Sequence, residues 1–304
     1  MAISRAQLVK ELEPGLNALF GLEYKRYDNQ HAEIYTNESS DRAFEEEVML
    51  SGFANANVKV EGSGVNYDQA QETYSARYTH DTIALAFAIT EEAIEDNLYD
   101  KISSRYTKAL ARSMSNAKQV KAAAPLNNGL PTVDGFDSGD GESLFNTAHT
   151  TVSGTNVKNT LTTQADLNET SLEQALIDIA AFTDERGLRV AAKGMKMIIP
   201  SANQFSAERL LKSQGRTGTA DNDINAVASM GMVPQGYRVN NFLTDSDSWY
   251  IITDVPNGMK MFTRAPLTTA MEGDFDTGNV RYKARERYSF GVSDYRGIYG
   301  CEGA

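Results

Sequence analysis

The sequence is poor in the residues that build covalent or metal-centred chemistry. Its 304 residues include one cysteine, Cys301, and three scattered histidines, His31, His80 and His149. A single cysteine can form neither an internal disulfide nor a zinc site of its own, and it favours folding in a reducing cytosol. No run of eighteen apolar residues occurs, and the first residues lack the apolar stretch of a secretory signal. We therefore expect no membrane span, no signal peptide and no metal centre.

The balance of charge limits the partners that the protein can bind. Twenty-nine basic residues stand against 41 acidic ones, which gives a formal net charge of −12. Affinity for DNA comes mostly from neutralisation of phosphates by lysine and arginine, so a general nucleic-acid binder is excluded. Any contact with DNA must use a local basic stripe. At 41% apolar and 23% charged residues, the composition is that of an ordinary soluble protein with a sizeable core.

Motifs of the common enzyme classes are absent. The sequence contains no G-x-S-x-G, no H-E-x-x-H and no G-x-x-x-x-G-K-[ST]. His149 is interpreted as an ordinary loop histidine. The acids Asp134, Asp137, Asp140 and Glu142 lack the spacing of an EF-hand and are interpreted as a flexible acidic loop. We therefore expect no catalytic residues, no cofactor and no bound metal.

The first third of the chain reads as a helix, an arm and a hairpin. Residues 4–20 form a leucine-striped helix that Pro14 should kink or split. Residues 21–48 are polar and aperiodic, which is typical of an extended arm with little to bury against its own chain. Residues 53–82 alternate around a turn at 61–64 and have no strongly apolar face, so this hairpin is expected to be marginal within one subunit.

The remainder mixes helices and strands without regular alternation, which predicts an α+β class. A strand over 83–89 has one bulky and one small face. A long helix should follow from Thr90 to about residue 124, where Pro125 stops it. The later elements are expected in the following order: loops over 127–168, a helix over 171–185, a strand over 195–199 ending at Pro200, a helix over 201–213, and strands near 237–243, 249–254, 259–264 and 280–292.

Two basic rows are candidate contact surfaces. One stripe of cations shares a single face of the long helix: Lys101, Arg105, Lys108 and Arg112. It either faces packaged DNA or a neighbour's acids, or it is a solvated face with local ion pairs. A second row alternates along the last strand: Arg281, Lys283, Arg285 and Arg287. Like charges on one strand face repel unless anions lie opposite. The anions come either from a neighbouring subunit or from the same chain, and plain exposure is the remaining alternative.

The order of these elements resembles a known family. An arm, a two-stranded loop, a long helix, a shorter helix, a strand ending in proline and a long C-terminal strand are similar to the HK97-fold major capsid proteins of tailed phages. Local text agrees: MKMIIPSANQF (195–205, with Gly187 before it), LFNTAH (144–149), which resembles Mu-like head subunits, and YSFGVSDYRGIYG (288–300). The resemblance covers nearly the whole chain and rests on the combined order, because no single stretch is a strict motif.

The resemblance implies a domain layout. The expected parts are an N-terminal arm (1–48), an E-loop (49–82), a P-domain (83–190) with a spine helix (90–124), an A-domain (191–265) and a returning P-domain strand (266–304). Hairpin residues that would contact other subunits are Lys59, Tyr74, Arg77 and Tyr78. Some family members crosslink a lysine to an asparagine, and Lys59 is a candidate for that role that no motif fixes.

The resemblance also implies a role. Such a protein forms homopentamers and homohexamers that close an icosahedral virion head around double-stranded DNA, after assembly in the host cytoplasm. Its partners would be other copies, a portal protein, a separate scaffolding protein, since no long charged extension precedes the arm, and in some phages a decoration protein. Two alternatives remain open. One is an encapsulin-like cellular compartment of the same fold, and the other is a soluble enzyme of unknown reaction.

Overall fold

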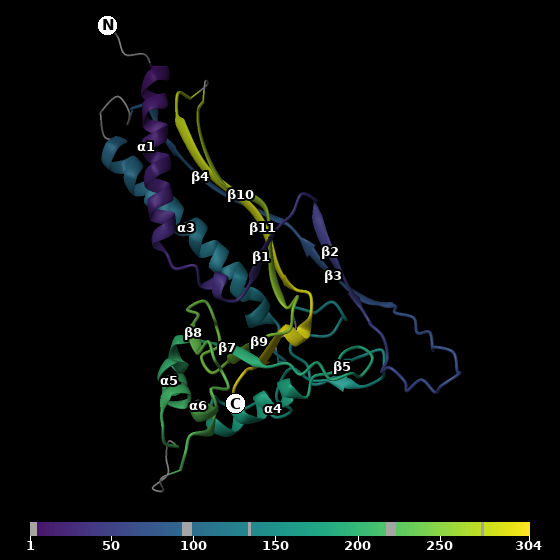
Figure 1. The fold of residues 1–304 in the computed structure, drawn as a ribbon. Coiled ribbons are helices and arrows are strands. Elements are labelled where there is room, and N and C mark those ends of the chain that lie inside the picture. Colours follow the sequence, from purple (N-terminus) through teal and green to yellow (C-terminus); the bar gives the residue numbers. More distant parts are fainter. Residues whose placement is uncertain (1–4, 93–98, 133–134, 217–222, 275–276) are drawn as a thin grey trace.

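The chain forms an elongated blade on a broader base, with one loop that projects from the side (Figure 1). The computed structural model describes residues 5–92, 99–132, 135–216, 223–274 and 277–304, and the side chains of 5–12 and 99–102 are not described. The described part of the chain begins at the far end of the blade, and the C-terminus lies in the base.

A four-stranded sheet forms one layer of the blade. Its order is β1-β10-β11-β4, with β1 parallel to β10 and the other pairs antiparallel. The strands are β1 (Thr36–Ser39), β10 (Met259–Gly273), β11 (Val280–Val292) and β4 (Asp81–Ile89). The expected strands over 83–89 and 280–292 are therefore present, and β10 runs well beyond the expected 259–264.

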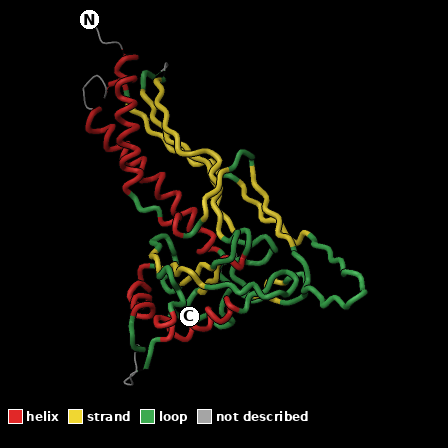
Figure 2. The backbone as a smooth tube through the Cα atoms, in the orientation of Figure 1, coloured by secondary structure: helices red, strands yellow, loops and turns green. Residues whose placement is uncertain are grey.

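Two helices cover one face of this sheet, α1 (Arg5–Arg26) and α3 (Tyr99–Asn128), as Figure 2 shows in red beside the yellow strands. The shared core consists of buried side chains from both layers: Leu16, Phe20, Leu110, Ala111, Met114, Tyr282 and Ala284. Complete burial of one large apolar side chain contributes about 1.5–3 kcal/mol. The blade is thus a two-layer structure, and no helix among the described residues covers the other face of its sheet.

Two prolines that were expected to interrupt helices lie inside them. Pro14 is within α1 and Pro125 is within α3, which continues to Asn128. The predicted stop at Pro125 is therefore wrong. Of the two outcomes predicted at Pro14, a kink or a split, the split is wrong. A proline removes one helical hydrogen bond and costs about 3 kcal/mol, which favourable packing can offset. Ala123 and Leu126, on either side of Pro125, are fully buried. Residues 93–98 of the predicted spine helix lie outside the described residues.

The predicted arm is folded against its own subunit. After α1, the chain forms the short 3-10 helix η1 (Gln30–Glu33) and then strand β1. Ile34 and Tyr35 are 6% exposed, and Tyr35 donates from its hydroxyl to the Ala122 carbonyl at 2.6 Å. The expectation that residues 21–48 bury little within the subunit is therefore wrong.

The predicted hairpin has different strands from those expected. Strand β2 (Phe44–Leu50) pairs antiparallel with β3 (Glu72–Thr79), and residues 51–71 between them form no strand. Tyr74, Ala76 and Tyr78 share one face of β3. Ala76 and Tyr78 are buried, so this hairpin does bury side chains within its own subunit.

The base holds the larger core. Its sheet has the order β12-β9-β7-β8, and its inner residues include the fully buried Trp249 and Tyr250. The elements of the base and of the loops beside it are β5 (His149–Thr150), β6 (Asn156–Val157), α4 (Glu169–Ala180), β7 (Gly194–Ile199), η2 (Ser201–Asn203), α5 (Gln204–Lys212), α6 (Ala226–Met230), β8 (Tyr237–Val239), β9 (Trp249–Thr253), η3 (Tyr295–Gly297) and β12 (Ile298–Cys301).

Two glycines touch where the blade meets the base. Gly258 precedes β10, and Gly297 precedes β12. A Cβ atom built on Gly258 would lie 2.7 Å from the Cα of Gly297, and one on Gly297 would lie 2.3 Å from the Cα of Gly258. Real Cβ atoms essentially never come so close to backbone, so both positions require glycine.

Candidate assembly surfaces

The loop over 51–71 joins the end of β2 to the start of β3 and projects to the side of the molecule (Figure 1). The carboxylate of one residue forms contacts close to both ends of this loop. Asp68 accepts hydrogen bonds from the backbone N–H groups of Ala54 and Gln69, and its Oδ1 lies 2.8 Å from Nη2 of Arg186. These contacts lower the pKa of Asp68. Arg186 follows α4, so this ion pair ties the loop to the rest of the subunit.

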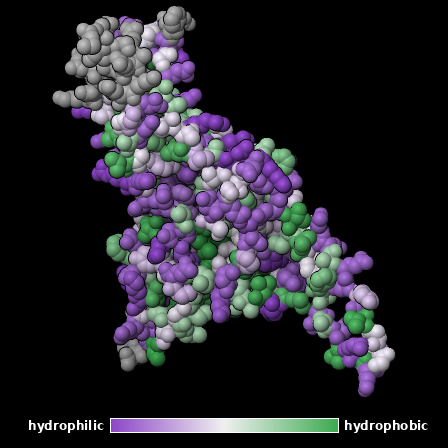
Figure 3. Space-filling view, turned by 45° about the horizontal axis from the view of Figure 1, so that its top comes forward, coloured by the Kyte–Doolittle hydropathy of each residue, from purple (hydrophilic) through white to green (hydrophobic). Residues whose placement is uncertain are grey.

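The tip of the loop exposes apolar side chains. Val58 is 94% exposed, Tyr67 98%, Val60 68% and Val65 67%. In Figure 3 hydrophobic residues lie among polar ones along this projection. Soluble monomers rarely expose apolar side chains so completely in one segment, and such segments mark interaction sites. The loop therefore has the composition of a contact element.

The hairpin candidates occupy different environments. Lys59 lies in the exposed loop, whereas Arg77 packs over the Phe44 ring at 4.1 Å and lies 3.7 Å from Glu46. Tyr74 is half-buried, and Tyr78 is 3% exposed with its ring 4.7 Å from that of Phe262. Tyr78 is therefore a core residue of this subunit with almost no surface for a neighbour. The contact roles of Lys59 and Arg77 stay predictions.

The basic row of β11 points away from the helices. Along this strand the even positions from Val280 to Tyr288 are buried and the odd positions are not. Arg281, Lys283 and Arg285 are exposed, and Arg287 is half-buried. They therefore share the uncovered face of the sheet, as the alternation predicted.

Small residues flank this row. Lys283 lies between Ala86 of β4 and Ala270 of β10. Arg285 lies between Ala84 and Thr268 in the same way. Exposed cations therefore stand between short side chains, and the surface beside them is open to another molecule.

The row is only partly paired within the chain. Nη2 of Arg281 binds Oδ2 of Asp274, and Nε of Arg287 donates to the His80 carbonyl at 3.4 Å. Lys283 and Arg285 form no ion pair with any residue that the structure describes. The two central cations are thus the ones available to a partner.

The stripe on α3 is also exposed. Arg105, Lys108 and Arg112 have exposed side chains and no ion pair among the described residues. The side chain of Lys101 lies outside the described residues. Two other cations of this helix turn toward the sheet, where Lys118 binds buried Glu286 at 3.1 Å and Lys121 binds Asp81. Burial raises the pKa of Glu286 despite the nearby Lys118.

His149 is not an ordinary loop histidine. It is fully buried, its Nδ1 lies 2.6 Å from Asp140, and its Nε2 lies 3.2 Å from Oδ1 of Asn159. Its ring stacks on Tyr295 with centroids 3.9 Å apart. The pKa of Asp140 is lowered, because hydrogen bonds from His149 and Ser138 outweigh the effect of burial. The predicted acidic loop is thus ordered around His149, although Asp134 lies outside the described residues.

A buried arginine continues this polar cluster. Arg296 is 2% exposed and binds Glu185 at 2.6 Å and Asp294 at 3.2 Å. Its guanidinium also lies 4.5 Å from the centre of the Tyr295 ring. Removing one partner of a buried ion pair leaves an uncompensated charge, so each member is required by the others. No sequence motif marks this cluster, because Arg296 and Glu185 are 111 residues apart in the chain.

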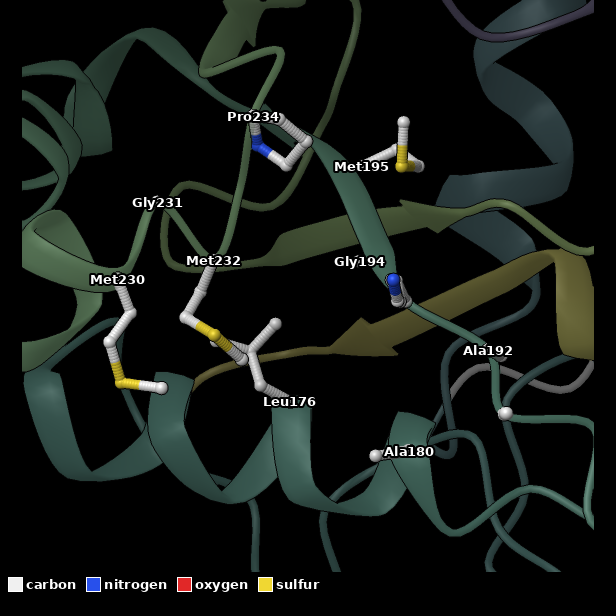
Figure 4. A pocket seen from close by; sticks show the side chains of 11 residues that line it. Leu176, Ala180, Ala192, Gly194, Met195, Met230, Gly231, Met232 and Pro234 are labelled. Carbon is white, nitrogen blue, oxygen red and sulfur yellow. The ribbon is translucent and has the colours of Figure 1, made fainter.

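An apolar groove of about 620 Å³ lies between α4, the start of β7 and the turn after α6 (Figure 4). Its lining includes Leu176, Met195, Met230 and Met232, with Lys193 as the only charged residue. Met230 is 70% exposed at its rim. Apart from Lys193, no lining residue of the groove carries an acid–base or nucleophilic side chain.

Neither membrane nor metal sites were found in the described part of the chain. None of its helices is long and apolar enough to cross a membrane. No group of three histidine, cysteine or acidic side chains there could hold a metal ion. Cys301 is buried, and burial raises the pKa of its thiol.

Comparison with known proteins connects the chain to a family. A family model described as phage capsid protein matches residues 73–300. The capsid of an empty GTA particle is similar, with a TM-score of 0.55, 13% identity and 91% of each chain covered. The capsid of Myoviridae phage XM1 has a TM-score of 0.54 and 13% identity over 89% of each chain. A virus-like particle from Pyrococcus furiosus has a TM-score of 0.53 and 11% identity, covering 95% of this chain and 98% of that one. No curated protein matches the sequence.

At these low identities, the similarity to solved structures shows only the fold. The match to the family model shows which family the chain belongs to. The mixed helix and sheet architecture is that of the HK97-like capsid proteins, as the order of elements in the sequence predicted. The matched region covers well over half of the chain. The chain therefore belongs to the phage capsid protein family and is a shell-forming structural protein of the HK97 type.

Proposed function

We propose that this protein is a major capsid protein that assembles into pentamers and hexamers and closes an icosahedral head around double-stranded DNA. It does so without catalysis. The titratable pair with the geometry of an acid–base centre, His149 and Asp140, is buried and holds both histidine nitrogens in hydrogen bonds. A general base must reach its substrate, and this one cannot.

The observation that carries the proposal is the projecting loop over 51–71. Four large apolar side chains near its tip are at least two-thirds exposed, and Asp68 forms contacts close to both of its ends. An exposed apolar loop whose end is held to the subunit by hydrogen bonds and an ion pair is suited to bind the same surface on each neighbouring copy. The alanine-flanked cations Lys283 and Arg285 form a second such surface, which we propose receives acidic side chains of a neighbouring subunit.

The domain layout and the remaining partners follow from the same proposal. Residues 1–48, 49–82, 83–190, 191–265 and 266–304 act as arm, E-loop, P-domain, A-domain and returning strand. Assembly takes place in the host cytoplasm with a separate scaffolding protein and a portal protein, and a decoration protein is a further candidate. Lys59 in the exposed loop remains a candidate for a covalent crosslink.

One rival function shares the same fold. A virus-like particle from Pyrococcus furiosus has this fold too, so the fold does not separate a phage head from an encapsulin-like compartment, which is the second candidate. Purified particles distinguish the two, because a phage head would enclose DNA and a compartment would enclose protein cargo.

Shell formation by loop variants tests the proposal. The chain is expressed alone and with its scaffold, and particles are examined by negative-stain microscopy. We expect closed shells from the natural sequence and only soluble subunits when Val58, Val60 and Tyr67 are changed to Ser. A variant with Asn57→Ser, at an exposed polar position of the same loop, is the matched control. A monomeric globule under all conditions would favour a soluble enzyme instead.

A further inference from the structure

The outward face of α3 carries positive charge that the subunit does not use. Residues 103–128 contain five basic residues and no acidic one. Lys118 and Lys121 bind carboxylates of the sheet, whereas Arg105, Lys108 and Arg112 are exposed without a described ion pair. These three are spread over two helical turns, or about 10 Å.

The residues between these cations are small or polar. Ala109, Ser113 and Asn116 are exposed on the same stretch of helix. In the described part of α3, the large apolar side chains that are exposed are Val120 and Tyr106, and Tyr106 contacts the Phe87 ring at 5.8 Å. Protein–protein interfaces need a desolvated core of aromatic or aliphatic anchors, which this stretch lacks. Interfaces with nucleic acid are more polar and far more positive.

The two basic faces of the blade lie on opposite sides of its sheet. Tyr282 and Ala284 of β11 pack against α1 and α3, so Lys283 and Arg285 point the other way. On the sheet face, short side chains lie beside Lys283 and Arg285, so another protein chain could approach these two cations closely. The helix face has isolated cations on a convex surface, which suits a rod of regularly spaced negative charge.

We infer that the outward face of α3, formed by Arg105, Lys108 and Arg112, contacts the phosphates of double-stranded DNA enclosed by the shell. This inference rests on the proposed function. The contact is independent of base sequence, because guanidinium and ammonium groups that bind phosphates carry no sequence information. A local patch of this kind also reconciles DNA contact with a chain of net charge −12.

Salt-dependent binding of a labelled DNA duplex to the purified subunit tests this inference. The test variant is Arg105→Gln, Lys108→Gln, Arg112→Gln. The control variant, Arg281→Gln, Lys283→Gln, Arg285→Gln, loses the same total charge from the opposite face. If all three α3 cations contact phosphates, the slope of log K against log salt should shrink by about 2.7 in the test variant. The control should keep the slope of the natural sequence.

The outcomes separate this inference from the proposed function. Equal loss of slope in both variants, or no loss in either, overturns the inference. It is also overturned if the α3 variant binds the duplex normally but fails to form shells, because the face would then contact a neighbouring subunit. The absence of shells from the natural sequence itself would instead overturn the proposed function. Circular dichroism melting of each variant verifies that folding is unchanged.

Discussion

Gln119 on α3 holds His31 of the N-terminal arm by two hydrogen bonds. The backbone N–H of His31 donates to Oε1 of Gln119 at 3.0 Å, and Nε2 of Gln119 lies 3.0 Å from Nδ1 of the imidazole. The first contact fixes the orientation of the amide, so its NH₂ group faces Nδ1 and that nitrogen acts as the acceptor. The segment that follows α1 is thus attached to α3 by a neutral histidine.

This attachment should be sensitive to acid. Burial and the nearby Lys118 lower the pKa of His31 from 6.5 to about 4. Because the folded-state pKa is depressed, the stabilisation is present above about pH 6.5 and is lost as the pH falls toward 4. Urea unfolding near neutral pH and near pH 4.5 should show a larger loss of stability in the natural chain than in His31→Phe. Equal losses in the two chains would contradict this assignment.

His149→Ala should destabilise the subunit. The substitution leaves a cavity beside Tyr295 and removes the partner of Asp140, so we expect a loss of roughly 2–4 kcal/mol in the free energy of unfolding. Chemical denaturation measures it directly. Thr147→Ala, at an exposed position two residues earlier, is the control and should change stability little. A stable His149→Ala protein would mean that the buried cluster is dispensable.

Charge reversal at the centre of the β11 row should block assembly without unfolding the subunit. Lys283 and Arg285 are the members without described partners, so Lys283→Glu with Arg285→Glu removes attraction to acidic neighbours while the core stays intact. Particle yield by sedimentation should fall to background with an unchanged melting temperature. The charge-conserving pair Lys283→Arg and Arg285→Lys should still assemble. Normal assembly of the reversed variant would show that the row is only a solvated face.

Amide exchange on the unassembled subunit should divide the hairpin in two. Residues 72–79 pair with β2 and bury Tyr78, so their amides should be protected. Residues 53–67 form no strand and should exchange quickly, apart from the Ala54 amide bound to Asp68. Assembly should then add protection to 53–67. Strong protection of that segment before assembly would count against its role as a contact element.

Local pattern predicted the elements whose signals are local. The alternation of β11 placed its cations on one face, and the strand predicted over 195–199 ends where β7 ends. Pro14 and Pro125 do not end the two long helices that contain them. Packing around Leu126 and along Leu16 and Phe20 outweighs the loss of one helical hydrogen bond.

Long-range pairing explains most of what the sequence did not reveal. Strand β1 has no apolar alternation and exists because its backbone pairs with β10, more than 200 residues later. The polar cluster has the same origin, since Asp140, His149 and Arg296 meet only in the folded chain. The local pattern therefore predicted which cations of β11 are exposed, whereas it did not predict the buried polar residues of the cluster.

The contact between Gly258 and Gly297, where the blade joins the base, is the point about which the blade would rotate. Strand β10 starts directly after Gly258 and has 15 residues, or roughly 50 Å at about 3.3 Å per residue. A rotation of one degree at its root therefore moves the far end by roughly 0.9 Å over that length. A methyl group on Gly258 or Gly297 would force the two backbones apart and tilt the blade. The same small tilt would be repeated in every subunit of a closed shell. Together these tilts would change the curvature of the shell, although the substitution lies far from any surface at which subunits meet.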